Sequence, residues 1–176
     1  MRTSMISLLL LPIACAEASP PITAPMAPAS ASSPALASAT RGVVITENNA
    51  EAAAGVLGIT AASYWTPDSG VIARLESQLR AGLEQERASL PGVAAEVGKV
   101  LDHLNEYRLQ YIGIVTAEGT RLVLVNGAPR EQCDAPDSSE HWQQVQSVED
   151  GGFWYWRIQY DVTSERFLEF DSNGYA

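Results

Sequence analysis

The pattern of apolar and polar residues predicts one long helix in the middle of the chain and a shorter one after it. Between Pro67 and Ala88 apolar residues recur at helical spacing, and charged residues occupy the remaining faces. Thr66 suits the N-cap of this helix, and Pro91-Gly92 ends it. The helical spacing continues more briefly from Val93 to Glu106. The apolar stripe of the long helix consists of Val71, Ile72, Leu75, Leu79 and Leu83.

From Tyr107 onward the pattern is that of strands. Residues Tyr107–Thr116 and Arg121–Asn126 are rich in β-branched and aromatic types and flank a turn, which predicts a hairpin. Both faces of this hairpin are apolar, which is typical of central strands covered on both sides. Further strands are expected over Gln143–Asp150, Phe153–Tyr160 and Arg166–Asp171. In the second of these, we assign one face to the core: Trp154, Trp156, Ile158 and Tyr160.

The segment before the long helix is ambiguous. Val43–Ile45 fits a short strand, and Ala52–Ala62 fits a helix weakened by two glycines. The whole order predicts an α+β domain in which an N-terminal helix, or two, packs on an antiparallel meander of about four to five strands, cystatin-like in outline. We place this domain at 41–176 and its core at 64–176, because every aromatic residue lies at or after Tyr64.

Residues 1–16 have the features of a secretory signal peptide. Arg2 is the only charged residue among them, and the apolar stretch Ile6–Ile13 is far shorter than the roughly 20 residues that span a bilayer. Two ways of processing fit this segment. Ala14-Cys15-Ala16 suits ordinary cleavage before Glu17, whereas Pro12–Cys15 resembles a bacterial lipobox, in which Cys15 is lipidated and becomes the first residue.

Residues 17–40 are expected to form a disordered linker. Most of them are Ala, Pro or Ser, so the segment cannot bury enough apolar surface to offset its ordering entropy. If Cys15 is removed or lipidated, Cys133 has no cysteine to pair with. Acidic neighbours disfavour its thiolate, and we interpret Cys133 as a tolerated loop thiol.

The charge of the chain limits its partners. The 176 residues include 11 Lys and Arg against 21 Asp and Glu, which gives a net charge of −10. This argues against nucleic acid and against an anionic membrane surface as the main partner. Contact with a membrane is expected only through a lipid anchor at Cys15.

Several short motifs are spread over residues 64–176. They are Tyr64-Trp65-Thr66-Pro67, Tyr107–Gly113, Asn126, Asp150-Gly151-Gly152, Tyr160-Asp161 and the run from Phe167 to Asn173-Gly174-Tyr175-Ala176. Together they resemble a small family of uncharacterised exported bacterial proteins. The resemblance implies export and a single domain but no particular activity. Relatives carry a cysteine soon after the Asn and another beyond the paired glycines. Here Cys133 corresponds to the first, and Trp154 stands near the second.

Residues for catalysis or metal binding do not form a recognised pattern. His103 and His141 are isolated and lack a ligand spacing, so neither a metal site nor a cofactor is expected. Glu149-Asp150 is the best carboxylate pair for glycoside cleavage, but adjacent residues point to opposite faces of a strand.

One surface remains as a candidate for binding a partner. Strand alternation places Phe153, Tyr155 and Arg157 opposite the core face, and aromatic and arginine side chains commonly anchor interfaces. Residues Gln143–Ser147 are similar to the Gln-x-Val-x-Gly protease-binding loop of cystatins, with Ser in place of Gly; an ordinary strand is the alternative.

These observations favour an exported, non-enzymatic domain that binds a protein or another component of the cell envelope. The chain is expected in the periplasm or outside the cell, or lipid-anchored to the outer membrane. The alternative is an envelope hydrolase or transferase that uses acidic residues, so enzymatic activity stays open.

Overall fold

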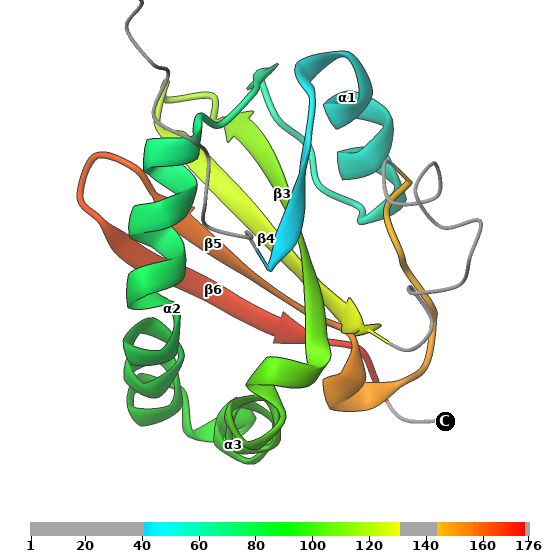
Figure 1. The fold of residues 1–176 in the computed structure, drawn as a ribbon, viewed down its shortest axis with the longest axis vertical. Coiled ribbons are helices and arrows are strands. Elements are labelled where there is room, and N and C mark those ends of the chain that lie inside the picture. The colour runs from blue at the N-terminus through cyan, green and yellow to red at the C-terminus, as the bar shows by residue number, and fades with distance from the viewer. Residues whose placement is uncertain (1–40, 131–143, 175–176) are drawn as a thin grey trace, which may run out of the picture. The chain divides into compact units, whose positions relative to one another are not determined.

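The computed structural model describes residues 41–130 and 144–174. The described residues form three α-helices and a six-stranded, mixed but mostly antiparallel open sheet (Figure 1), which confirms the α+β class. The predicted signal peptide, the linker, Cys15, Cys133 and His141 lie outside the described residues. No helix of the described part is both long and apolar enough to cross a membrane.

The sheet is a meander with two additional strands at one edge. Its order is β1-β3-β4-β5-β6, and β2 also pairs with β3. Strand β1 runs parallel to β3 along Leu109–Ile112, and β2 runs antiparallel to it along Gly113–Val115. The elements are β1 (Gly42–Ile45), α1 (Glu47–Val56), β2 (Ser63–Trp65), α2 (Ser69–Ser89), α3 (Ala94–Asp102), β3 (Tyr107–Val115), β4 (Arg121–Pro129), β5 (Trp156–Asp161) and β6 (Arg166–Ser172). The expectation of an antiparallel meander of about four to five strands with one helix or two is therefore confirmed in part: β1 adds a parallel pairing, and α1 adds a third helix.

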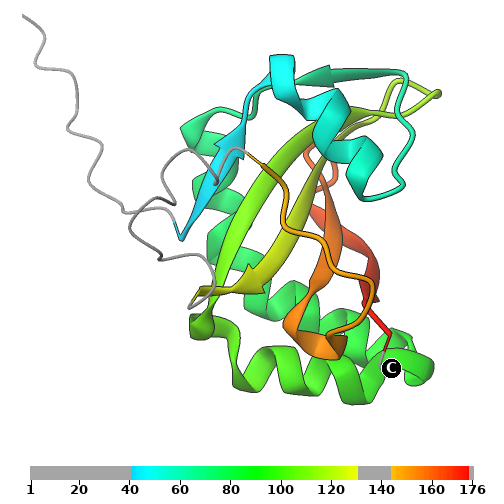
Figure 2. The same ribbon diagram turned by 90° about the vertical axis from the view of Figure 1, so that its right-hand side faces the viewer.

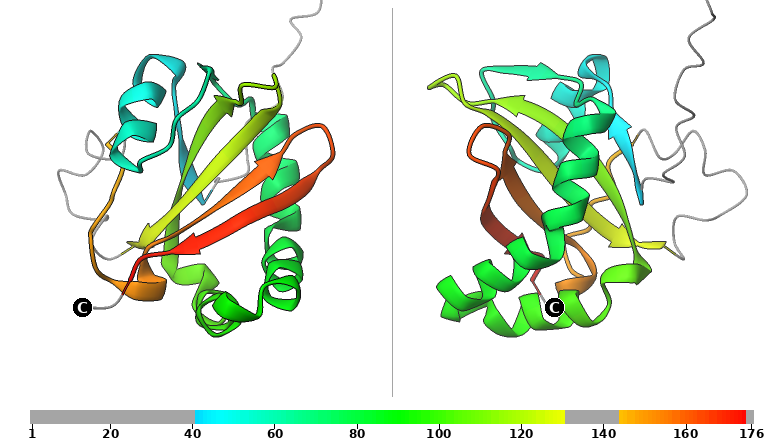
Figure 3. Two further views of the ribbon diagram at one scale, coloured as in Figure 1. Left: turned by 180° about the vertical axis from the view of Figure 1, so that it is seen from behind. Right: turned by 60° about the vertical axis from the view of Figure 1, so that its left-hand side comes forward.

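Helices α2 and α3 cover one face of the sheet, which we call the inner face (Figures 2 and 3). The predicted stripe of α2 is buried there against Trp156, Ile158 and Tyr160 of β5. Trp154 was assigned to the same face but lies in a short 3-10 helix, Gly152–Trp154, and is only partly buried. Strand β5 therefore begins three residues later than predicted, at Trp156.

Helix α1 covers part of the opposite, outer face. Its small residues Ala50 and Ala53 pack with Leu57 on Ile112 of β3 and Leu124 of β4. Because strands β3 and β4 are thus covered on both sides, the prediction that this hairpin is central is confirmed. Residues 144–150 also lie on the outer face, where they form no strand, contrary to the prediction.

Helix α2 starts two residues later than predicted. The N-cap is Asp68, whose Oδ1 accepts a hydrogen bond of 2.9 Å from the backbone N–H of Val71. Thr66 instead accepts from the N–H of Glu47 at 2.9 Å, through its Oγ1. The predicted N-cap residue therefore satisfies the first turn of α1 rather than that of α2.

Candidate binding face

The structure places the three residues predicted to bind a partner in three different surroundings. Phe153 lies in the 3-10 helix before β5, where its ring centroid is 5.4 Å from that of His103 and 4.7 Å from that of Trp154. It packs at the edge of the inner core rather than on the outer face. The interruption of the strand by the 3-10 helix removes the alternation on which its predicted position depended.

Tyr155 is buried under the chain's own backbone. Gly151 adopts a φ of 137° and lies directly against the ring, since a Cβ on this glycine would come within 2.7 Å of Tyr155 Cδ2. Ala128 of β4 packs on the same side chain. Tyr155 therefore does not form part of an exposed row with Phe153 and Arg157.

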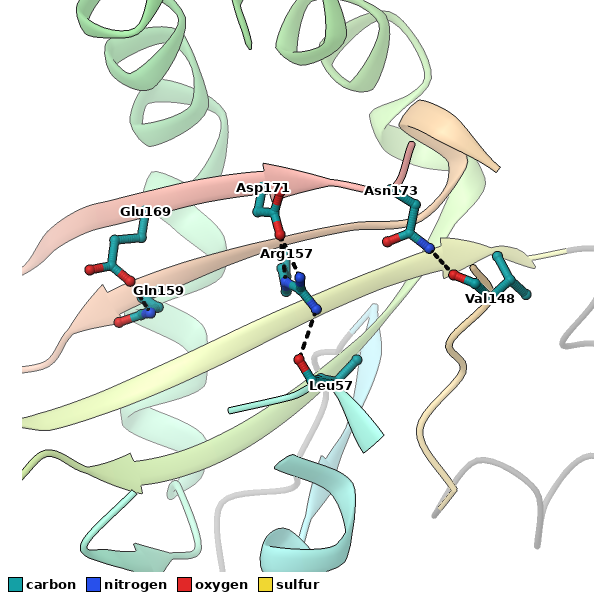
Figure 4. Close-up of polar contacts among 7 residues, drawn as sticks. All are labelled: Leu57, Val148, Arg157, Gln159, Glu169, Asp171 and Asn173. Atoms are coloured by element: carbon teal, nitrogen blue, oxygen red, sulfur yellow. Dashed lines mark hydrogen bonds and ion pairs between the residues drawn. The ribbon is translucent and has the colours of Figure 1, made fainter. Parts of the chain in front are cut away.

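Arg157 is the residue of the three that reaches the outer face, and each of its three guanidinium nitrogens donates a hydrogen bond (Figure 4). Its Nε donates to Asp171 Oδ2 at 3.0 Å, Nη2 donates to the same oxygen, and Nη1 donates to the carbonyl of Leu57 at 3.0 Å. These bonds join β5 to β6 and to the turn after α1. Arg157 thereby positions α1 on the sheet.

Arg157 is one member of a polar row that crosses the outer face from strand to strand. Gln110 of β3 pairs with Asn126 of β4, Asn126 pairs with Arg157 of β5, and Arg157 pairs with Asp171 of β6. Paired residues of neighbouring strands point to the same face, so the four side chains form a continuous line. We call these four residues the polar row.

The two halves of the polar row differ in exposure. The side chains of Arg157 and Asp171 are 28% and 54% exposed, whereas the residues Gln110 and Asn126 are 0% and 4% exposed. Beside the exposed half, β5 and β6 present Gln159, Leu168 and Glu169, with a hydrogen bond from Gln159 Nε2 to Glu169 Oε2 (Figure 4). Among the described residues, the outer face of the sheet is therefore open over β5 and β6, at Arg157, Gln159, Leu168, Glu169 and Asp171, and closed over β3 and β4.

Residues 144–148 cover the closed half in an extended course. Gln110 Nε2 donates to the carbonyl of Gln144 at 2.8 Å, and Asn126 Nδ2 donates to the carbonyl of Gln146 at 3.0 Å. Asn173 Nδ2 donates to the carbonyl of Val148 (Figure 4). We call Gln110, Asn126 and Asn173 the amide ladder.

Two further bonds complete this arrangement. Gln110 Oε1 accepts from the backbone N–H of Gln146 at 3.1 Å and from Asn126 Nδ2 at 3.0 Å. The two buried amides thus bond each other and the covering backbone, as buried polar groups must to avoid a desolvation penalty.

A second polar cluster on the inner face joins α2, β3 and the start of β1. Glu76 Oε1 accepts from the hydroxyl of Tyr111 and, at 3.1 Å, from the backbone N–H of Arg41. Burial, and then the hydrogen bond with Glu76, raises the pKa of the Tyr111 phenol well above its ordinary value. Tyr111 therefore stays protonated at neutral pH and serves as a structural donor.

The remaining residues singled out in the sequence do not converge. His103 Nδ1 lies 3.0 Å from Glu106 Oε1 at the end of α3. Glu149 and Asp150 are exposed, and Asp150 forms an isolated bridge with Gly174. Among residues 41–130 and 144–174, no group of three His, Cys, Asp or Glu residues is arranged to hold a metal ion.

The amide ladder was not predicted from the sequence. A signal was present, because Gln110 lies within one mostly apolar stretch and Asn126 ends the other, and both stretches were expected to be buried on both faces. Two amides at such positions require hydrogen-bond partners on the covering layer. The third amide, Asn173, was singled out only as part of the motif that ends in Asn173-Gly174-Tyr175-Ala176.

No family model matches this chain, and no curated protein or solved structure matches it either.

Proposed function

We propose that this chain is an exported, non-enzymatic binding domain that attaches to a protein or another component of the cell envelope through the outer face of its sheet. The observation that carries this proposal is the open strip over β5 and β6. There Leu168 is 37% exposed beside the Arg157–Asp171 pair, next to a half of the same face that already holds a stretch of polypeptide. The strip combines an exposed leucine with an arginine that is partly exposed, and arginine is enriched among the residues that anchor interfaces.

Export is supported by the signal-like residues 1–16, by the linker-like residues 17–40 and by the resemblance to a family of exported bacterial proteins. The mature chain starts either at Glu17 or at a lipidated Cys15. Intact-mass measurement of the mature protein distinguishes the two. A full-length, unmodified chain inside the cell would contradict export.

We also propose a cystatin-like outline for the part of the fold that begins at β2. In support, α2 connects β2 to β3, and β2 through β6 are neighbours in chain order with antiparallel pairing. Strand β1 and helices α1 and α3 are additions to that outline. Residues 144–147, which were compared with the cystatin loop, lie between β4 and β5 and are bonded to the sheet.

The binding function is tested by capture from envelope extract with a matched pair of variants. Leu168 on the open strip and Leu90 after α2 are similarly exposed, at 37% and 40%, but belong to different faces. We expect the tagged chain to retain a defined component, Leu168→Lys to abolish its retention, and Leu90→Lys to leave it unchanged. Equal retention by all three chains would overturn the proposal that the outer face binds.

A further inference from the structure

The contacts of the amide ladder recognise a backbone rather than a particular sequence. Its three amides donate to the carbonyls of Gln144, Gln146 and Val148, which are two residues apart. Carbonyls two residues apart point to the same side of an extended chain. The spacing of the three amides therefore matches the two-residue repeat of an extended chain. The ladder binds this chain with side-chain groups, whereas a sheet edge binds a strand with backbone groups.

The side chains of the covering segment contribute few contacts. Within residues 144–150, Val145 packs against the outer core, whereas Gln144, Ser147 and Val148 are exposed. Val148 is among the exposed large apolar residues of the described chain. A segment held mainly through backbone bonds, with its side chains toward solvent, is replaceable by another extended stretch of different sequence.

The ladder also stands out against its neighbours on the same strands. The neighbouring pair on the same face is Ile112, two residues after Gln110 on β3, and Leu124, two residues before Asn126 on β4. This pair is buried under α1 by apolar packing. An apolar pair in place of Gln110 and Asn126 would have covered the sheet without the cost of desolvating two amides. Two buried amides at these positions are useful for holding a polypeptide backbone.

We propose that the amide ladder is a binding track for an extended peptide segment of a partner protein, and that residues 144–148 occupy this track until the partner displaces them. This inference rests on the proposed binding function and adds the chemistry of the partner: an extended backbone with free N–H and carbonyl groups and little demand on side chains. It is a form of strand addition in which the track lies across a sheet face instead of along an edge.

Residues 144–148 occupy the amide ladder, so they have to be displaced before a free peptide can bind in an experiment. A tethered segment acts at an effective concentration in the millimolar range, so it competes strongly with a free peptide. We therefore replace residues 144–148 of the full chain by Gly-Ser-Gly-Ser-Gly, which loses the packing of Val145 and raises the entropic cost of seating the segment.

The probe is a fluorescein-labelled peptide with the sequence of residues 144–149, Gln-Val-Gln-Ser-Val-Glu, and the measurement is fluorescence anisotropy. We expect the replaced chain to bind it at least about tenfold more tightly than the unmodified chain. A peptide that keeps valine at its second position, the place of Val145, and scrambles the other residues should bind within about threefold of the first, because the ladder contacts backbone atoms. A peptide with proline in place of Gln146 should bind at least about tenfold more weakly, because proline lacks the N–H that Gln110 accepts.

Variants of the ladder identify the site. In the replaced chain, Asn126→Leu and Asn173→Leu should each weaken binding at least about tenfold, whereas Gln85→Leu, on the exposed side of α2, should not change it. Asn173 follows the last strand and is partly exposed, so its variant remains informative if the buried Asn126 variant fails to fold. Circular dichroism confirms that each chain is folded.

Absence of peptide binding by the folded, replaced chain would overturn the proposal, and so would binding that Asn173→Leu leaves unchanged. Either result would show that the ladder holds only the chain's own segment. Such a failure is distinct from failure of the binding function. Capture that depends on Leu168 would persist in the first case and would be absent in the second.

Discussion

Replacing Gly82 by alanine tests the packing of α2 against the sheet. Gly82 lies inside α2 and is buried, and a Cβ built on it would stand 2.1 Å from Cδ2 of Phe167 on β6. Carbon atoms in contact are normally about 3.5–4.0 Å apart. The added methyl group therefore forces either the ring of Phe167 or the helix itself to move.

Two effects of opposite sign compete in this variant. Alanine is favoured over glycine in a helix interior by about 1 kcal/mol, which stabilises the folded state. Inserting a methyl group into a well-packed core costs about 1–3 kcal/mol, and the overlap with Phe167 belongs at the upper end of that range. We expect a net loss of about 1–2 kcal/mol in the free energy of unfolding.

The same substitution in the other helices should have the opposite sign. A Cβ on Gly98 of α3 would lie 3.5 Å from Cζ of Arg87, an ordinary contact. A Cβ on Gly55 of α1 would have no atom within 4 Å among the described residues outside its own stretch of helix. At these two positions there is no steric overlap, so only the preference of alanine over glycine in a helix affects the stability. Gly98→Ala and Gly55→Ala should therefore stabilise the fold by about 0.5–1 kcal/mol each, less at Gly55 because it lies near a helix end.

Urea unfolding, followed by tryptophan fluorescence, measures the three variants under one set of conditions. Gly82→Ala combined with Phe167→Leu should destabilise by less than the sum of the two single substitutions, because the smaller side chain makes room for the methyl group. If Gly82→Ala proved as stable as Gly98→Ala, the close approach of α2 to β6 would be refuted.

Three further predictions follow from burial and titration. Trp156→Ala should destabilise the fold by about 3–5 kcal/mol in urea unfolding, and Leu168→Ala by less than about 1 kcal/mol, because the former is buried and the latter is on the open strip. The hydrogen bond from Ser164 lowers the pKa of Asp161 in the folded state. The ionised carboxylate therefore stabilises the fold above its ordinary pKa of 3.8, and this stabilisation is lost as the pH falls below that value. Asp161→Asn should remove that part of the acid dependence in pH-resolved unfolding. Burial raises the pKa of Tyr111, so the folded state favours the neutral phenol and loses stability as the pH rises above 10. Tyr111→Phe should weaken this alkaline loss.

Helix and hairpin positions were predictable because each of these elements has its own period. The 3.6-residue repeat of α2 and the apolar run of β3 and β4 are local properties, and the structure confirms both. The segments before α2 were ambiguous because they are short and alanine-rich. In the structure, α1 (Glu47–Val56) and β1 (Gly42–Ile45) are held by packing on the sheet and by parallel pairing with β3.

The candidate site was predicted less well. Alternation from Phe153 to Tyr160 supported an exposed row, but a 3-10 turn at Gly152–Trp154 shifts the start of β5 to Trp156 and turns Phe153 toward the inner core. Tyr155 is buried by Gly151, whose positive φ allows the backbone to approach the ring. Neither effect has a signal in the pattern of apolar and polar residues.

By itself, the sequence determined the α+β class, the amphipathic helix α2, the central hairpin and the burial of Trp156, because periodicity and side-chain type act within a single element. Tertiary structure decided which polar residues meet. Gln110, Asn126 and Asn173 lie up to 63 positions apart in the chain (from 110 to 173), and strand register together with the path of residues 144–148 brings them to one track. Register and chain path depend on contacts between distant segments, which no local pattern encodes.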